Sequence, residues 1–192
     1  MTDPLAKLFG SPSRVKLLRL FLFNPRQSFT VSEAASRAYV TAPEAKREAT
    51  LLARAGIIER ATRGKGLRYT LDPDFRHTAA LQSLLLNPTV RASELLERLR
   101  SVGTLKFIAV AGIFVGEWDG RLDVLVVGDR IKERSLRERM KRFEAELGRE
   151  MRFALLTSED LLYRLTVSDR LVRDVFDYPH RVILDKLNTG LK

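Results

Sequence analysis

Residues 29–71 read FTVSEAASRAYVTAPEAKREATLLARAGIIERATRGKGLRYTL. Thr30 is followed three residues later by Glu33, the spacing of a capping box, so a short helix is predicted to begin there. Thr41 can cap the next helix, in which alanine and leucine recur at helical spacing as far as about residue 55. Gly56 ends this helix, because glycine is favoured just after a helix C-terminus. The stretch therefore predicts two helices joined by a tight bend.

The segments on either side extend this pattern. An earlier helix is predicted with Ser11 as its N-cap, Pro12 in its first turn and Pro25 as its stop. After the third helix, two strand-like runs flank RGKG (residues 63–66), whose glycines permit the positive φ that a hairpin turn needs. Three helices followed by a basic hairpin resemble a winged helix-turn-helix domain, which we place at residues 1–75. The resemblance implies double-stranded DNA as the partner.

The major groove of B-form DNA admits one helix, and a basic hairpin can lie over the phosphate backbone. Arg47 is the candidate for a guanine, because a guanidinium can donate to both O6 and N7. Glu44 would repel phosphate unless it accepts from a cytosine amine. For each candidate the alternative is a side chain that is merely solvated. The predicted DNA-binding residues are Thr41, Pro43, Lys46, Arg47 and Thr50 on the helix, and Arg60, Arg63, Lys65 and Arg68 on the hairpin.

Charge and composition agree with a nucleic-acid partner and exclude several other classes of protein. The net charge is +10, and residues 1–75 hold 13 Lys and Arg against 7 Asp and Glu. No apolar run approaches the roughly 20 residues of a membrane span, and no secretory pattern opens the sequence. There is no cysteine and there are only two histidines. We therefore expect a cytoplasmic protein, without membrane contact, that binds no metal and no cofactor.

The rest of the chain has a different organisation. Residues 76–103 are predicted to be a helical connector. From residue 104 onward, β-branched runs alternate with helical stretches, which indicates a small α/β domain with a mixed sheet over residues 104–192. The predicted fold class is therefore α+β, with two domains.

Residues 112–129, GIFVGEWDGRLDVLVVGD, place a glycine after one strand and an acid on the next. This order resembles the nucleotidyltransferase-like domain of the polymerase-β superfamily. The resemblance implies a serine after the glycine, two alternating aspartates and a third carboxylate from a later strand, which together hold two divalent ions. Here Gly112 is followed by Ile113, Arg121 occupies the first aspartate position, and Asp123 keeps the second. We therefore predict a pseudoenzyme with no catalytic residues.

Strand alternation would put Arg121 and Asp123 on one face, so we expect them to form an ion pair. As an alternative, Arg121 and the loop amides could bind an anion such as a nucleotide phosphate. The predicted function is a homodimeric transcriptional regulator whose second domain serves dimerisation, ligand sensing or partner contact. Two alternatives remain open: a metal-dependent nucleotidyltransferase delivered by its winged helix, and a non-catalytic protein-interaction module.

Overall fold

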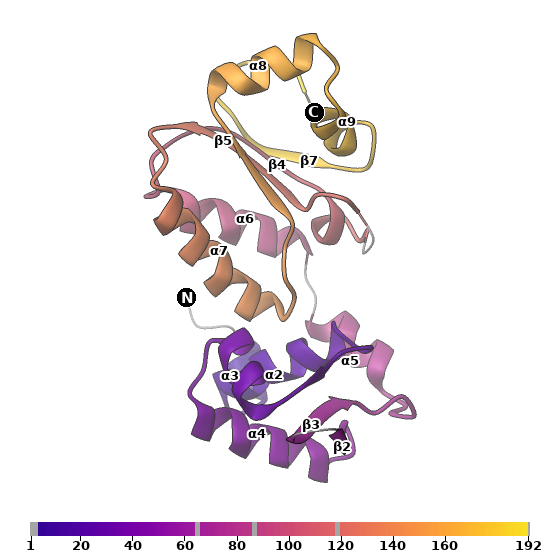
Figure 1. Ribbon diagram of the computed structural model, residues 1–192. Coiled ribbons are helices and arrows are strands. Elements are labelled where there is room, and N and C mark those ends of the chain that lie inside the picture. Colours follow the sequence, from indigo (N-terminus) through magenta and orange to yellow (C-terminus); the bar gives the residue numbers. More distant parts are fainter. Residues whose placement is uncertain (1–3, 64–65, 86–87, 118–119, 192) are drawn as a thin grey trace. The chain divides into compact units, whose positions relative to one another are not determined.

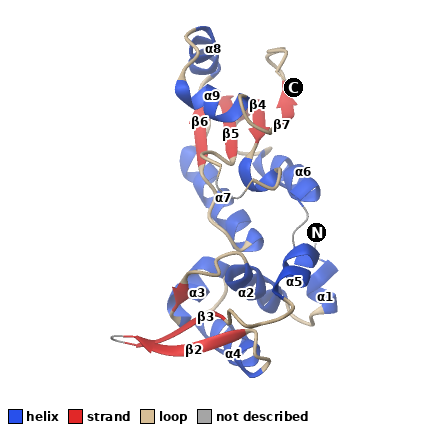
Figure 2. Ribbon diagram, turned by 90° about the vertical axis from the view of Figure 1, so that its right-hand side faces the viewer, coloured by secondary structure: helices blue, strands red, loops and turns tan. Residues whose placement is uncertain are grey.

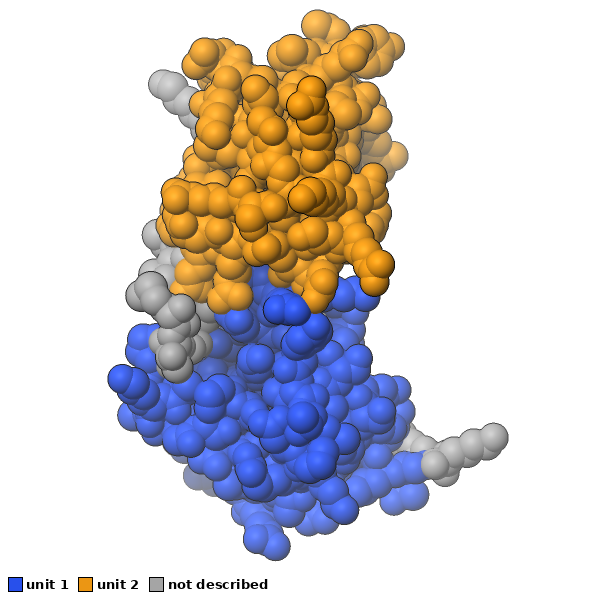
Figure 3. Space-filling view, turned by 90° about the vertical axis from the view of Figure 1, so that its left-hand side faces the viewer, with its two compact units in different colours: residues 1–86, 141–150 blue, residues 87–140, 151–192 orange. Residues whose placement is uncertain are grey.

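The structure is a computed structural model that describes residues 4–63, 66–85, 88–117 and 120–191, apart from the side chains of residues 63 and 88–91 (Figure 1). Within the described part the chain is α+β, as predicted, with nine α-helices and two sheets. It divides into two compact units (Figure 3). Unit 1 comprises residues 1–86 and 141–150, and unit 2 comprises residues 87–140 and 151–192.

The helices of unit 1 begin where their capping residues predict. The Ser11 side chain accepts from the Arg14 amide, and both the Thr30–Glu33 and the Thr41–Glu44 capping boxes are formed. The elements of this unit are α1 (Pro4–Leu8), α2 (Pro12–Leu22), β1 (Ser28–Phe29), α3 (Val31–Ala38), α4 (Ala42–Arg54), β2 (Ile58–Arg63), β3 (Gly66–Leu71) and α5 (Thr78–Leu85).

A three-stranded sheet in the order β1-β3-β2 completes the first part of unit 1. The predicted hairpin is present, with β2 and β3 antiparallel from Ile58↔Leu71 to Arg63↔Gly66. Strand β1, which the sequence did not predict, pairs Ser28 with Thr70 on the other side of β3. A strand of two residues has no alternation to detect, so only its tertiary pairing reveals it.

The end of helix α7 (Glu133–Leu147) also belongs to unit 1. Buried Arg19 donates to the carbonyl oxygen of Glu146 at 3.1 Å, and buried Asn24 donates to that of Gly148 at 2.6 Å. Buried polar groups need such partners, so residues 141–150 complete this unit. This division differs from the predicted domains, which assigned those residues to the second one.

Unit 2 is built on a mixed four-stranded sheet in the order β6-β5-β4-β7, in which only β5 and β6 are parallel. Helices α8 and α9 lie on one side of the sheet and α6 on the other (Figure 2). None of the described helices is long and apolar enough to cross a membrane. The elements are α6 (Pro88–Leu99), β4 (Thr104–Val110), the 3-10 turn η1 (Gly112–Phe114), β5 (Val124–Asp129), the start of α7, β6 (Phe153–Leu156), α8 (Ser158–Thr166), α9 (Arg170–Phe176) and β7 (Arg181–Asp185).

The face toward α8 and α9 is closed by a hydrophobic cluster. Side chains that alternate along β4 and β5 meet the apolar stripes of the two helices, which is the pattern expected of a half-covered sheet. Leu122, just before β5, and Val172, near the start of α9, both belong to this cluster. The cluster consists of Phe107, Ala109, Leu122, Leu125, Val127, Leu156, Leu161, Val172 and Val175.

Candidate functional site

The first turn of α4 is fixed by hydrogen bonds to the carboxylate of Glu44. Its Oε2 accepts from the Thr41 amide at 2.9 Å and from the Thr41 hydroxyl at 2.6 Å. Its Oε1 accepts from the Ser13 hydroxyl at 3.0 Å, which ties α4 to α2. These hydrogen bonds, those from Thr41 first, lower the pKa of Glu44 to about 2. Both carboxylate oxygens are therefore engaged, and Glu44 acts as a cap rather than as a free acceptor for a base.

Helix α4 carries its basic residues on the exposed side. Lys46 is exposed, and its carbonyl oxygen accepts from the Thr50 hydroxyl at 2.8 Å. Arg47 has an exposed side chain, and its Nη2 lies 3.1 Å from Oε1 of Glu48. Pro43 is also exposed, in the first turn. Helix α4 thus presents these two cations to solvent, and Arg54 in its last turn is exposed as well.

Glu48 is an acid that the sequence analysis did not single out. It is buried and also accepts from Nε of Arg14 at 2.9 Å. Burial alone would raise the pKa of Glu48, but hydrogen bonds from Arg14 and Arg47 hold it below its ordinary value. Arg47 therefore stabilises the buried carboxylate of Glu48. Its guanidinium has five N–H groups, so it can still donate to a second partner.

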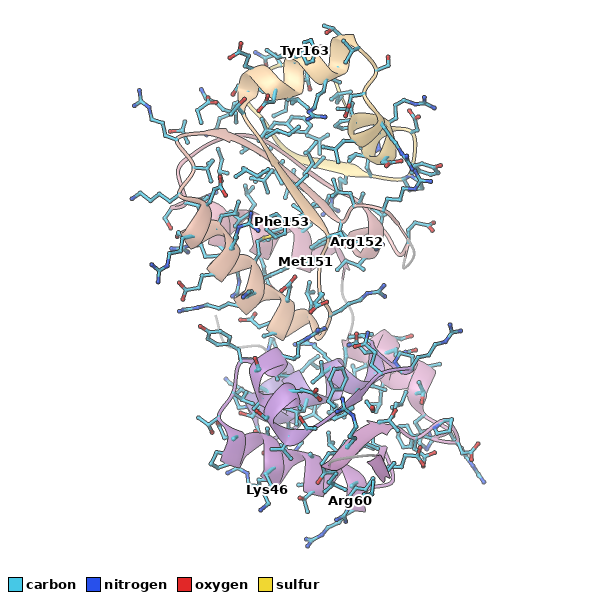
Figure 4. All side chains as sticks on the ribbon, in the orientation of Figure 1. Lys46, Arg60, Met151, Arg152, Phe153 and Tyr163 are labelled. Carbon is cyan, nitrogen blue, oxygen red and sulfur yellow. The ribbon has the colours of Figure 1, made fainter. Side chains whose placement is uncertain are left out.

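The two described arginines of the hairpin differ in their surroundings. Arg60 on β2 is exposed, and in Figure 4 it and Lys46 extend from the same edge of unit 1. Arg68 on β3 is half-buried and donates to the Ser28 carbonyl oxygen at 2.6 Å and to Oε2 of Glu33 at 2.7 Å. It therefore fastens β3 to β1 and α3. The predicted contact Lys65 and the side chain of Arg63 lie outside the described residues.

In unit 2, Asp123 is completely buried and fully engaged. Its Oδ1 accepts from the Ile113 amide at 3.2 Å. Its Oδ2 accepts from the amide and from Nε of Arg152, at 2.8 and 3.2 Å. Asp123 thus joins the loop after β4 to the residue that precedes β6, which is labelled in Figure 4.

The predicted ion pair between Arg121 and Asp123 is wrong. Nη1 of Arg121 lies 2.9 Å from Oδ1 of Asp174 in α9, and its side chain is 58% exposed. Strand β5 begins only at Val124, so the two-residue alternation does not extend back to Arg121. The cation beside Asp123 is Arg152, which no local pattern in the sequence connects with an acid 29 positions away. Arg152 directly precedes β6.

Four amides of the loop are also occupied. The Phe114 amide donates to the Ala111 carbonyl oxygen, and the Val115 and Glu117 amides donate to that of Gly112, at 2.9–3.0 Å. With the bond from Ile113 to Asp123, four amides are no longer available to an anion. Gly112 has φ +51°, and a Cβ there would lie 2.1 Å from Oδ1 of Asp123, so the turn requires glycine.

Within the described part of the chain, no three His, Asp or Glu side chains form a group that could hold a metal ion. Next to the Gly112 loop, however, unit 2 has a cavity of about 360 Å³ that Arg121 and Asp174 line. The four positions that the resemblance singled out thus have different surroundings. A buried hydrogen bond joins Ile113 and Asp123, whereas Gly112 and Arg121 line the cavity.

Comparison with protein-family models, with curated proteins and with solved structures found no match to this chain. Its function must therefore be inferred from its own residues and geometry. Two regions offer material for that inference. One is the exposed basic surface of α4 and β2 in unit 1, and the other is the cavity beside the Gly112 loop in unit 2.

Proposed function

We propose that the protein is a DNA-binding transcriptional regulator whose unit 1 is a winged helix-turn-helix that contacts duplex DNA. The observation that carries the proposal is the exposure of Lys46, Arg47 and Arg60 on a helix and a hairpin that follow one another in this order. A helix flanked by a basic hairpin suits the major groove and the adjoining backbone. We further propose a homodimer in the cytoplasm that binds a two-fold operator.

The contacts divide into those that read bases and those that add affinity. Helix α4 would enter the major groove with Arg47 toward a guanine, and Thr50 and Pro43 toward a methyl group or the sugar-phosphate backbone. Lys46 and Arg60 would pair with phosphates, which raises affinity without sequence preference. Arg68 would act indirectly, by holding the hairpin against α3.

For unit 2 we propose a nucleotidyltransferase-like domain without catalysis, which serves dimerisation, ligand sensing or partner contact. Asp123, the acid kept from the family pattern, is buried and paired with Arg152. A divalent cation would have to displace this guanidinium and the two amides that donate to the carboxylate. This cost favours the regulator over a metal-dependent nucleotidyltransferase.

The test is the salt dependence of DNA binding. Fragments selected from genomic DNA would be titrated with the full chain by fluorescence anisotropy at about 50 and about 200 mM salt. The Lys46→Ala/Arg60→Ala variant is suitable because neither residue holds a buried acid. We expect its affinity to fall at least tenfold and its salt slope to drop by about 2.

The matched control is Arg100→Ala/Arg137→Ala, which removes two cations of unit 2 that are 66% and 67% exposed. It should bind DNA like the unmodified chain. Affinity that does not depend on salt, or equal losses in both double variants, would refute the proposal. The remaining alternative would then be a protein-interaction module.

A further inference from the structure

The carboxylate of Glu48 divides its two oxygens between two arginines. The Glu48 side chain is only 1% exposed. Its Oε2 accepts from Nε of Arg14 at 2.9 Å, and its Oε1 accepts from Nε and Nη2 of Arg47 at 3.3 and 3.1 Å. Arg14 also donates through Nη1 to the Phe9 carbonyl oxygen at 2.6 Å. Arg14 therefore holds the carboxylate from α2, and Glu48 does not depend on Arg47 for its position.

The edge of the Arg47 guanidinium that Glu48 occupies determines which edge stays available. A guanidinium carries five N–H groups in one plane. The Nε–H and one N–H of Nη2 form its side edge, and both point to Glu48. The end edge, which consists of one N–H from Nη1 and one from Nη2 in parallel, remains. The Arg47 side chain is 67% exposed, so this pair of donors can reach a partner outside the protein.

Two parallel donors match a guanine better than the other bases. Guanine presents the acceptors O6 and N7 side by side in the major groove, whereas adenine has a donor in place of O6. A freely rotating arginine would lose conformational entropy when it orders on a base. The contact with Glu48 orders the Arg47 guanidinium before any DNA is present, so this cost is reduced.

We propose that Glu48 is a positioning residue that presents the end of the Arg47 guanidinium to a guanine. Glu48 itself touches no base, since it is buried, and it acts only through Arg47. The inference rests on the proposed function, because it requires α4 to lie in the major groove. It deepens that function by naming a guanine as the base that each half of the operator contains at the Arg47 position.

The first test measures the Arg47 side chain in the free protein. Arginine Nε–H resonances of the full chain would be recorded by NMR, with the exposed Arg54 of the same helix as reference. We expect the Nε–H of Arg47 to exchange with water about tenfold more slowly than that of Arg54, because it donates to a buried oxygen. Equal exchange of the two arginines would overturn the proposal, with no DNA and no substitution at Glu48 involved.

The second test measures discrimination of guanine. In a bound genomic fragment, each guanine in turn would be replaced by 7-deazaguanine, which lacks only the N7 acceptor. We expect one guanine in each half of the operator at which this change weakens binding about tenfold. Arg47→Lys should abolish the difference, because an ammonium lacks the planar pair of donors. Glu48→Gln should reduce it to less than about threefold, because Arg47 is then less firmly ordered.

The matched control is Glu44→Gln, which changes another carboxylate of α4 that is bonded within the protein. Glu44 accepts from Thr41 and Ser13 and makes no hydrogen bond with Arg47 among the described contacts. Glu44→Gln should therefore keep the tenfold discrimination. Each variant would be measured below its unfolding temperature. A variant that is merely unstable would lose affinity for every duplex alike, so the ratio of the two affinities separates positioning from stability.

The outcomes distinguish this inference from the proposed function. Full discrimination in Glu48→Gln, or an equal loss in Glu44→Gln, would overturn the positioning role while the protein remains a DNA-binding regulator. Failure of the unmodified chain to bind any duplex would refute the regulator, and the guanine contact with it. Reduced discrimination in Glu48→Gln alone, with unchanged affinity for an unrelated duplex, would support both.

Discussion

Nε of Arg152 lies 3.2 Å from Oδ2 of Asp123, whose carboxylate is buried while the guanidinium is 45% exposed. The positive charge beside this buried carboxylate is thus supplied by an arginine. The Arg152 amide donates to the same oxygen at 2.8 Å, so side chain and main chain fix the acid together. The pair therefore holds the loop that borders the cavity against the start of β6.

Removing this cation should destabilise unit 2. Asp123 would keep its amide donors in Arg152→Met, so we expect a loss of about 1–3 kcal/mol rather than the larger cost of an isolated buried charge. Urea unfolding at neutral pH measures it. Arg137→Met, which breaks an exposed pair with Glu133, should cost less than about 0.5 kcal/mol. Equal effects of the two substitutions would show that the Arg152–Asp123 pair contributes no more to stability than an exposed ion pair.

Gly148 provides a test of whether residues 141–150 belong to unit 1. Its φ is +78°, and a Cβ there would lie 2.4–2.7 Å from backbone and Cβ atoms of Arg19. Gly56 has φ +69° with no atom within 4 Å of its Cβ position, so Gly56→Ala isolates the cost of the backbone conformation, about 1 kcal/mol. Gly148→Ala should cost about 1–3 kcal/mol more, because the clash is with main chain. Equal unfolding free energies for both variants would contradict this packing.

The parts of the fold that the sequence predicted well are set by short-range chemistry. The capping box at Thr30, the helix cap at Thr41 and the paired strands that flank RGKG depend on residues only a few positions apart, and all three were confirmed. Features that depend on distant partners were missed or wrong. Arg152 and Asp123 are 29 positions apart, and Asn24 and Gly148 are 124 apart, so no local pattern connects them.

In the candidate site, too, the sequence predicted only the features that depend on local patterns. Exposure of Lys46 and Arg60 follows from helix and strand periodicity, which the sequence displays. The different roles of Arg60 and Arg68 do not, because they depend on strand β1, which brings Ser28 to Arg68. The partner of Arg121 likewise depends on where β5 begins. Alternation of side chains along a strand does not show at which residue the strand starts, so the sequence could not predict this.

The cap formed by Glu44 makes stability depend on pH in a defined window. Hydrogen bonds from Thr41 and Ser13 lower the pKa of Glu44 from 4.5 to about 2. A lowered pKa stabilises the fold above pH 4.5, and this contribution disappears as the pH falls toward 2. Glu44→Gln should therefore be less stable than the unmodified chain at pH 6, and the two should converge as pH approaches 2. Urea unfolding at several pH values measures the difference, and in a Thr41→Val background its pH dependence should shrink. A difference that stays constant from pH 6 to pH 2 would argue against the cap.

Arg60 and Arg68 provide the last prediction, since they are cations of one hairpin with opposite surroundings. Arg60 is exposed, so Arg60→Met should leave the free energy of unfolding within about 0.5 kcal/mol and reduce the salt slope of DNA binding by about 1. Arg68 donates to Ser28 and Glu33, so Arg68→Met should cost about 1–2 kcal/mol of stability. Its salt slope should remain unchanged under conditions where the variant is folded. Urea unfolding and anisotropy titrations of the two variants separate these effects. A reduced salt slope in Arg68→Met alone would reverse the assignment and place the DNA backbone on the β1 side of the sheet.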